Sequence, residues 1–186
     1  MTIWDEWGRV TRFLQSARIA FAREDRLWGT IELADPSVAE VRVTRGESQY
    51  RVSLKQHREA VLDEQILFAS VLIHSHALVE AGASDRLGAN ASEMGGIEDW
   101  GNRLLTAAGT SWSEVLGGKA GLVEVATIRN CLSHGAHTMD KKGFNRIRDA
   151  DPATPWTAGA PIILTLENLE IYRARLRSLL RLGGVK

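Results

Sequence analysis

The sequence predicts a mainly α-helical bundle that carries a small antiparallel β insertion near residues 27–55. Apolar residues recur at three- and four-residue steps over several long stretches, which is the pattern of helices with a buried face. Between residues 27 and 55 the apolar residues instead alternate with polar ones, as in half-buried strands. With 186 residues, 44% of them hydrophobic and 25% charged, the chain has the composition of a globular protein, and we expect one domain over residues 1–186.

The first helix is expected from about residue 3 to 23, and its apolar face would consist of Trp4, Trp7, Val10, Leu14, Ala17 and Phe21. Extended segments follow it. Residues 29–33 alternate until Asp35 and Pro36 break the pattern, and two further alternating segments lie around residues 41–43 and 50–54. Residues 45–48, Arg-Gly-Glu-Ser, are a hairpin turn signal between these two segments. We therefore expect a sheet of two or three antiparallel strands.

A long central helix is expected over about residues 57–81, because the chain is apolar nearly all round from Val61 to Val79. Residues 82–96 are rich in Gly, Ser and Asn and are expected to form a loop. Further helices are predicted from Ile97 to Gly109, over about residues 122–134, and from the capping residue Thr165 onward. Prolines between residues 152 and 161 predict an irregular link before the last helix.

Charge is distributed unevenly along the chain, although the net charge is zero. Residues 129–186 hold ten Lys and Arg against five Asp and Glu, whereas residues 1–128 hold 13 against 18. A neutral protein is a poor candidate for indiscriminate nucleic-acid binding. The early Asp5 and Glu6, a longest apolar stretch confined to residues 65–73 and a single cysteine lead us to expect a cytoplasmic protein without a membrane segment or an internal disulfide.

Residues 128–137, Ile-Arg-Asn-Cys-Leu-Ser-His-Gly-Ala-His, contain the side chains most suited to chemistry. Arg129 carries a permanent charge whose fork matches phosphate oxygens. His134 has an ordinary pKa of about 6.5 and can take or give a proton near neutral pH. Asn130 adds an amide that donates and accepts hydrogen bonds. The three side chains supply an anion clamp, an acid or base and an orienting group, which is nearly the full set of groups for RNA cleavage without a metal or cofactor.

Gly135 predicts that the helix ends beside His134, because a glycine just past a helix is its usual left-handed cap. At about 100° per residue, Arg129 and His134 diverge by about 140° on one helix. A single helix would therefore hardly bring both onto one phosphate. A homodimer that joins two such helix ends would solve this problem.

An Arg followed by Asn and, four residues after the Arg, by His at the end of a helix resembles the signature of the HEPN superfamily. Arg129, Asn130 and His134 match that motif residue by residue. The resemblance implies a HEPN-like helical bundle with a composite site at a dimer interface. It further implies a metal-independent RNA endonuclease, acting as a toxin or in antiviral defence, with RNA as a partner and, for a toxin, an antitoxin protein as another. The alternative that the resemblance allows is a non-catalytic module that dimerises or binds RNA or a protein partner.

Five residues that follow the motif are expected to contact RNA phosphates: His137, Lys141, Lys142, Arg146 and Arg148. The alternative is an ordinary solvated basic face. Four acidic residues of the long helix are candidates to orient a motif residue, and the sequence does not select among Glu59, Asp63, Glu64 and Glu80.

Each motif residue also has a purely structural interpretation. Arg129 would then bond to helix carbonyls across a dimer, and His134 would pair with the helix dipole. Cys131 stands three residues before His134, but a lone helix cysteine is usually a small buried residue rather than a nucleophile. His74 and His76 are two residues apart and would point to opposite sides of a helix, so we predict no metal site there.

Overall fold

The computed structural model of the chain describes residues 2–30, 39–46, 48–135 and 137–186. These residues form seven α-helices, one short 3-10 helix and one pair of antiparallel strands, which confirms the predicted mainly α-helical fold with a small β insertion. The chain divides into two compact units. The first unit is Met1–Val10 with Phe68–Lys186, and the second is Thr11–Leu67.

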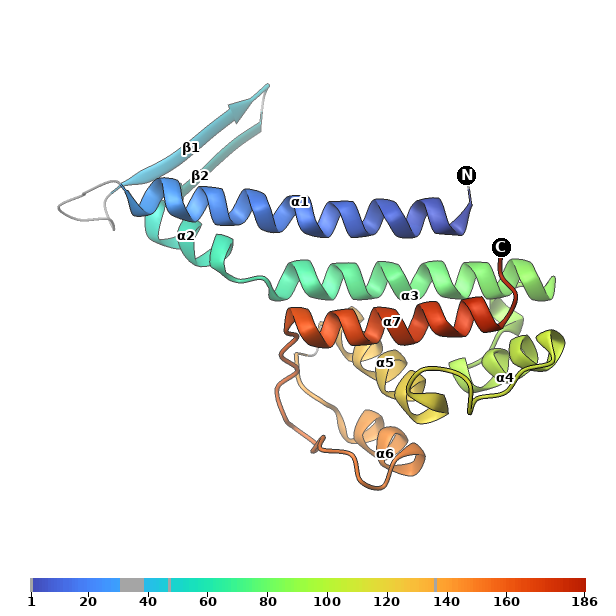
Figure 1. Ribbon diagram of the computed structural model, residues 1–186. Coiled ribbons are helices and arrows are strands. Elements are labelled where there is room, and N and C mark those ends of the chain that lie inside the picture. Colours follow the sequence, from blue (N-terminus) through green and yellow to red (C-terminus); the bar gives the residue numbers. More distant parts are fainter. Residues whose placement is uncertain (1, 31–38, 47, 136) are drawn as a thin grey trace. The chain divides into compact units, whose positions relative to one another are not determined.

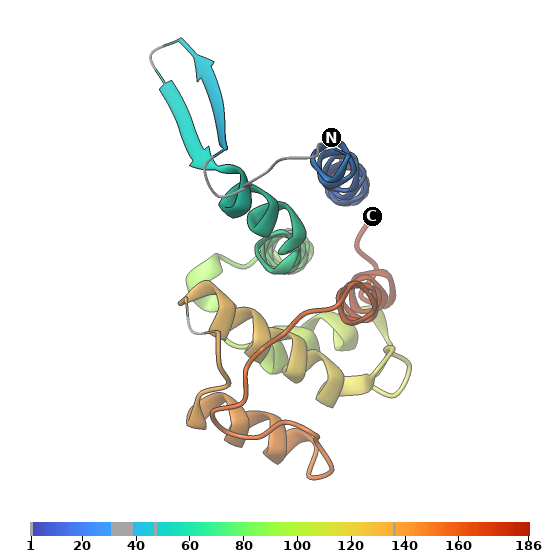
Figure 2. The same ribbon diagram turned by 90° about the vertical axis from the view of Figure 1, so that its left-hand side faces the viewer.

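The first unit is a helical bundle built around α5 (Gly118–Ser133). This helix packs against α4 (Ile97–Ala108), α6 (Lys141–Ala150) and α7 (Leu166–Leu182), and α7 runs beside α3 (Gln65–Leu87) in Figures 1 and 2. The side chains at the centre of the unit are wholly removed from solvent: Leu72, Trp100, Leu104, Leu122, Ile128, Leu169 and Leu176. Hydrophobic burial on this scale is the main force that holds the helices together.

Buried polar contacts also join these helices. The Arg173 guanidinium of α7 donates from Nε to Ser75 Oγ of α3 at 3.1 Å and lies 4.7 Å from the centre of the Trp7 ring in α1 (Ile3–Gly29). Glu124 of α5 accepts from the Trp156 indole and from the Tyr172 hydroxyl, at 2.9 and 3.0 Å. The proline-containing link between α6 and α7 is irregular, as predicted, and Trp156 anchors it to α5.

The long helix predicted over residues 57–81 is wrong in two respects. It is interrupted: α2 (Leu54–Leu62) ends at Asp63, whose carboxylate accepts from the Gln65 backbone N–H at 2.9 Å where α3 begins. It also continues past Ala81 to Leu87, so the first residues of the predicted loop 82–96 are helical. Gly82 lies inside this helix, at a place where a Cβ atom would collide with the Ile3 side chain. A short 3-10 helix, η1 (Ala91–Glu93), follows.

In the second unit, β1 (Glu40–Arg45) pairs with β2 (Ser48–Ser53), and both strands contact α2. The β structure is smaller than the predicted insertion over residues 27–55, because residues 27–29 are the last turn of α1 and residues 54 and 55 begin α2. The Trp28 indole donates to Glu24 one turn earlier at 2.6 Å and so extends α1. Most of the strand predicted over residues 29–33 lies outside the described residues.

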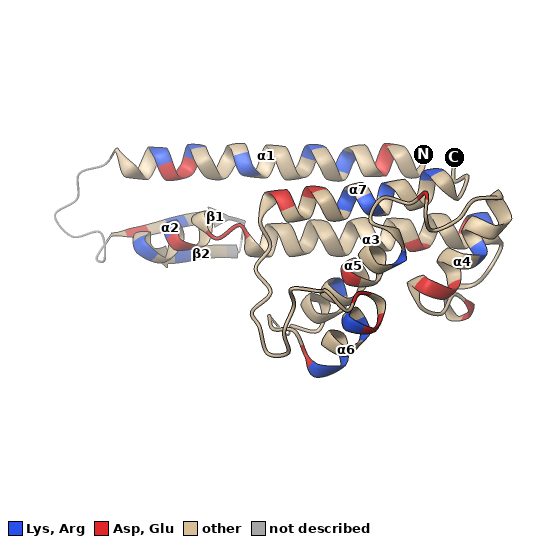
Figure 3. Cartoon of the chain, turned by 60° about the horizontal axis from the view of Figure 1, so that its bottom comes forward, with Lys and Arg blue, Asp and Glu red and all other residues tan. Residues whose placement is uncertain are grey.

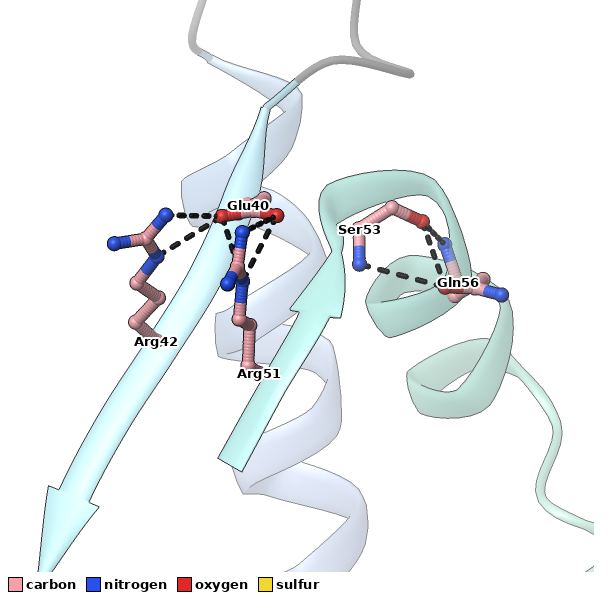
Figure 4. Close-up of polar contacts among 5 residues, drawn as sticks. All are labelled: Glu40, Arg42, Arg51, Ser53 and Gln56. Carbon is pink, nitrogen blue, oxygen red and sulfur yellow. Dashed lines mark hydrogen bonds and ion pairs between the residues drawn. The ribbon is translucent and has the colours of Figure 1, made fainter. Parts of the chain in front are cut away.

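Glu40 binds the two arginines that face each other across the hairpin, Arg42 and Arg51 (Figure 4). Its closest contacts to them measure 2.5 and 2.7 Å. Hydrogen bonds from Arg51 and Arg42 lower the pKa of Glu40 to about 2. Like charges directly opposite each other destabilise a strand pair, so Glu40 offsets a repulsion that the sequence itself creates.

Within the described residues, α3 is the one helix long and apolar enough to cross a membrane, with a mean hydropathy of 1.5 over 18 residues. The apolar stretch is therefore longer than the one expected within residues 65–73. Half of this window is buried inside the protein, and the core helix of a helical bundle passes the same test of length and composition.

A stability prediction concerns the start of α7, where the Thr165 hydroxyl accepts from the Asn168 N–H at 3.1 Å. Replacing Thr165 by Ala removes this cap and is expected to lower the free energy of unfolding by about 1 kcal/mol. Urea titration followed by circular dichroism measures the change. Thr165→Ser retains the hydroxyl and should restore most of the loss, and an equal loss in both variants would contradict the capping role.

Candidate functional site

The motif helix ends as its sequence predicts. α5 runs to Ser133, and the His134 N–H still donates to the Asn130 carbonyl at 3.2 Å. Gly135 then adopts a left-handed conformation with φ of +71°, which glycine tolerates at no steric cost. The His134 side chain is consequently exposed at the end of the helix.

Arg129 points from α5 towards α3 and is mostly buried there. Its Nη2 donates to Glu80 Oε2 at 2.5 Å and to His76 Nδ1 at 2.9 Å. Its Nη1 donates to Asn130 Oδ1 at 2.9 Å, which leaves the Asn130 amide NH₂ to act as a donor elsewhere. Of the four acidic residues that the sequence left open, Glu80 is thus the one bound to a motif residue.

His76 is 2% exposed and is held in its neutral form. Burial lowers its pKa, and this effect together with the charge of Arg129 outweighs the nearby Glu80 carboxylate, which would raise the pKa. Because a guanidinium can only donate, the Nδ1 atom of His76 accepts from Arg129 and carries no proton. Its Nε2 atom, buried and without a hydrogen-bond partner in the described part of the chain, then carries the proton.

Glu80 is the charged partner in this network. Burial alone would raise the pKa of Glu80, but the Arg129 guanidinium, which donates to it, holds this pKa below the ordinary value. The carboxylate therefore remains charged at neutral pH and balances Arg129. Together Arg129, Glu80 and His76 form a polar link between α5 and α3.

A cavity of about 200 Å³ opens on another side of α5. Asn130 and His134, four residues apart on the helix, both line it. The first turns of α6 complete the wall with Asp140, Lys142, Gly143 and Arg146. Arg129 is not part of the lining and instead contacts Glu80 of α3. Arg129 and His134 therefore point to different sides of α5, as the helical spacing predicts.

The five residues expected to contact RNA differ in their surroundings. Lys141 and Lys142 are exposed at the start of α6, a helix rich in basic residues (Figure 3). Arg146 is bound by Glu98 of α4 through two contacts of 3.1 and 2.5 Å, and Arg148 lies 5.2 Å from the centre of the Phe144 ring. His137 is exposed after α5. Only Lys142 and Arg146 share the cavity with the motif.

A larger groove of about 970 Å³ lies next to this cavity, between α5 and α6 and beside Glu98 of α4. Its charged lining consists of Lys119, Lys141, Lys142, Arg146, Glu98 and Asp149. Because Lys142 and Arg146 line both the groove and the smaller cavity, the two are neighbours along α6.

The remaining candidates from the sequence, the cysteine of α5 and the two histidines of α3, do not form a second reactive site. Cys131 is 5% exposed, as expected of a small apolar residue. His74 is exposed whereas His76 is buried, so the two point to opposite sides of α3 as predicted. Among the residues that the structure describes, no three His, Cys, Asp or Glu side chains gather closely enough to hold a metal ion.

The sequence analysis did not identify two partners of the basic residues, His76 and Glu98. A signal for His76 was present, because His76 and Glu80 are polar residues four apart on an otherwise apolar helix. Glu98 carried no such signal. Its pairing with Arg146 depends on how α4 and α6 meet, which the spacing within each helix does not determine.

Comparisons with protein-family models, with curated proteins and with solved structures gave no match.

The buried neutral His76 predicts a pH dependence of stability. The unfolded chain binds a proton at this residue below about pH 6.5, whereas the folded chain, with its lowered pKa, does not. The free energy of unfolding should therefore fall as the pH decreases below about 6.5, by at most about 1.4 kcal/mol per pH unit. Urea titrations at several pH values should show a smaller slope for His76→Gln.

His74→Gln, which alters an exposed histidine of the same helix, is the matched control and should retain the wild-type slope. An identical slope in wild type and His76→Gln would refute the neutral buried state of His76.

Proposed function

We propose that the protein is a metal-independent RNA endonuclease of HEPN type. The observation that carries this proposal is the cavity at the end of α5, where His134 and Asn130 lie beside Lys142 and Arg146. An exposed acid/base group, an amide donor and cationic side chains thus share one concave site. Metal-free RNA cleavage can use an acid/base group, an amide donor and a cation of this kind.

In the proposed reaction the RNA 2′-hydroxyl attacks the adjacent phosphorus in line and the 5′-oxygen leaves. His134 takes the proton of the attacking hydroxyl as a base while water protonates the leaving oxygen, or it gives a proton to the leaving oxygen as an acid while water takes the proton of the hydroxyl. The products are a 2′,3′-cyclic phosphate and a 5′-hydroxyl. Asn130 is well oriented to donate from its NH₂ to a phosphoryl oxygen, because its carbonyl oxygen is held by Arg129.

Arg129 stabilises the charge that develops on the phosphoryl oxygens, which is usually the largest contribution to such catalysis. Within one chain it is bound to Glu80 and lies outside the cavity that His134 lines. We therefore propose a homodimer joined near the end of α5, in which Arg129 of a second chain approaches His134 of the first. The proposed biological role is that of a toxin or an antiviral defence nuclease, and a toxin would require an antitoxin protein.

A non-catalytic module of the same fold is the second candidate, and a specific observation favours it. Two of the basic residues expected to meet phosphate are already neutralised inside the chain, Arg129 by Glu80 and Arg146 by Glu98. An arginine already paired with a carboxylate must give up that partner before it can bind a phosphate. Such a module would dimerise or bind RNA without cleaving it.

The test of the proposed activity is RNA cleavage in excess EDTA. Wild-type protein is expected to cleave. His134→Ala is expected to lose about 10²–10⁴-fold in rate, the usual effect of removing an acid/base group, and Arg129→Lys about 10²–10³-fold, the usual effect of removing one donor to the developing charge. Lysine keeps a charge beside Glu80 but lacks the guanidinium fork. Gel analysis of a mixed RNA substrate measures the rates.

His74→Ala and Arg86→Ala are the matched controls, since both remove an exposed residue of the same type from α3, and both should cleave at the wild-type rate. Wild-type activity in His134→Ala would refute the catalytic assignment. Activity that is lost in EDTA and restored by added Mg²⁺ would refute the metal-independent mechanism.

The composite site predicts complementation between two inactive variants. Mixing Arg129→Ala chains with His134→Ala chains yields heterodimers in which one of two sites keeps both residues, so part of the cleavage activity should return. The activity of the mixture is compared with each variant alone and with the dimer content measured by light scattering. A fully active monomer at micromolar concentration would contradict this arrangement.

A further inference from the structure

The groove between α5 and α6 has the lining of a ligand site. Its volume of about 970 Å³ is at the upper end of the range for small-molecule pockets. Its apolar lining comes from Ala120 and Val123 of α5 and Ala150 of α6, which provide a surface against which a flat ring can lie. The polar lining comes mainly from α6.

The charge of the groove favours an anion. Arg146 and Glu98 neutralise each other, which leaves Lys119, Lys141 and Lys142 against the single carboxylate of Asp149. Three lysine ammonium groups around one groove attract phosphate. Among molecules that combine a flat ring with phosphate, a nucleotide also carries a hydrogen-bonding base edge that the polar side chains of the groove can bind.

Asp149 and Asn145 stand four residues apart on α6 and face the same groove. An ionised carboxylate only accepts hydrogen bonds, so Asp149 selects a base edge that presents donors. Guanine offers two adjacent donors, N1–H and the N2 amino group, which match the two oxygens of one carboxylate. Adenine, cytosine and uracil have no ring N–H donor next to an amino group.

We infer that this groove is a guanine-nucleotide subsite, in which the lysines bind phosphate and Asp149 accepts from the guanine edge. The groove shares Lys142 and Arg146 with the cavity of His134, so it would hold a nucleotide of the RNA close to the bond that is cleaved. This last step rests on the proposed endonuclease function. The binding of guanine nucleotides themselves does not require cleavage.

The test is the binding of the four ribonucleoside 5′-monophosphates to the full chain, measured by NMR titration. GMP should bind at least about tenfold more tightly than AMP, CMP or UMP, the discrimination typical of one good bidentate contact to a base. Asp149→Asn should reduce this preference to less than about threefold. Lys141→Ala should weaken the binding of all four nucleotides by a similar factor.

Glu170→Gln removes one exposed carboxylate of α7 outside the groove lining and is the charge-matched control, so it should retain the preference for GMP. Equal binding of all four nucleotides, a preference unchanged in Asp149→Asn, or no binding at millimolar concentration would each overturn the inference. Selective GMP binding without RNA cleavage would refute the nuclease and uphold the subsite. RNA cleavage without selective GMP binding would refute the subsite and uphold the nuclease.

Discussion

The contact between Arg129 and Glu80 is the interaction on which the arrangement of the candidate site depends. It joins the motif helix α5 to α3 and leaves Arg129 mostly buried beside neutral His76. Removing one member would leave the remaining charge or polar atom buried without compensation, which is costly in a protein interior. Because α5 also packs against α4, α6 and α7, this contact helps fix where Asn130 and His134 meet the cavity.

The same network accounts for the divided motif. Arg129 and His134 are close in sequence, yet one faces α3 and the other lies in a cavity lined by α6. Asn130 connects the two sides, because its oxygen accepts from Arg129 while the residue lines the cavity. A nuclease would use this connection to aim the amide at phosphate, and a binding module would use it to keep the surface rigid.

Local patterns in the sequence determined the features that were predicted correctly. The mainly α-helical fold, the Thr165 cap and the left-handed Gly135 follow from periodicity and capping chemistry over a few residues. The break at Asp63 was missed because the apolar pattern from Val61 to Val79 continues across it. The helical Gly82 was missed because glycine usually marks a loop, whereas here it leaves room for Ile3, which is distant in sequence. Glu80 and Glu98 were not selected as partners of Arg129 and Arg146 for a related reason, since both pairings join helices that are distant in sequence.

The central claim is that His134 and its neighbours transfer a phosphoryl group to the RNA's own 2′-hydroxyl. Analysis of the ends of cleaved RNA by mass spectrometry, after reaction in EDTA, tests it most directly. The account predicts 2′,3′-cyclic phosphate on one fragment and 5′-hydroxyl on the other, with neither formed by His134→Ala. Fragments that carry 5′-phosphate and 3′-hydroxyl ends would contradict it, since they result from attack by water rather than by the 2′-hydroxyl.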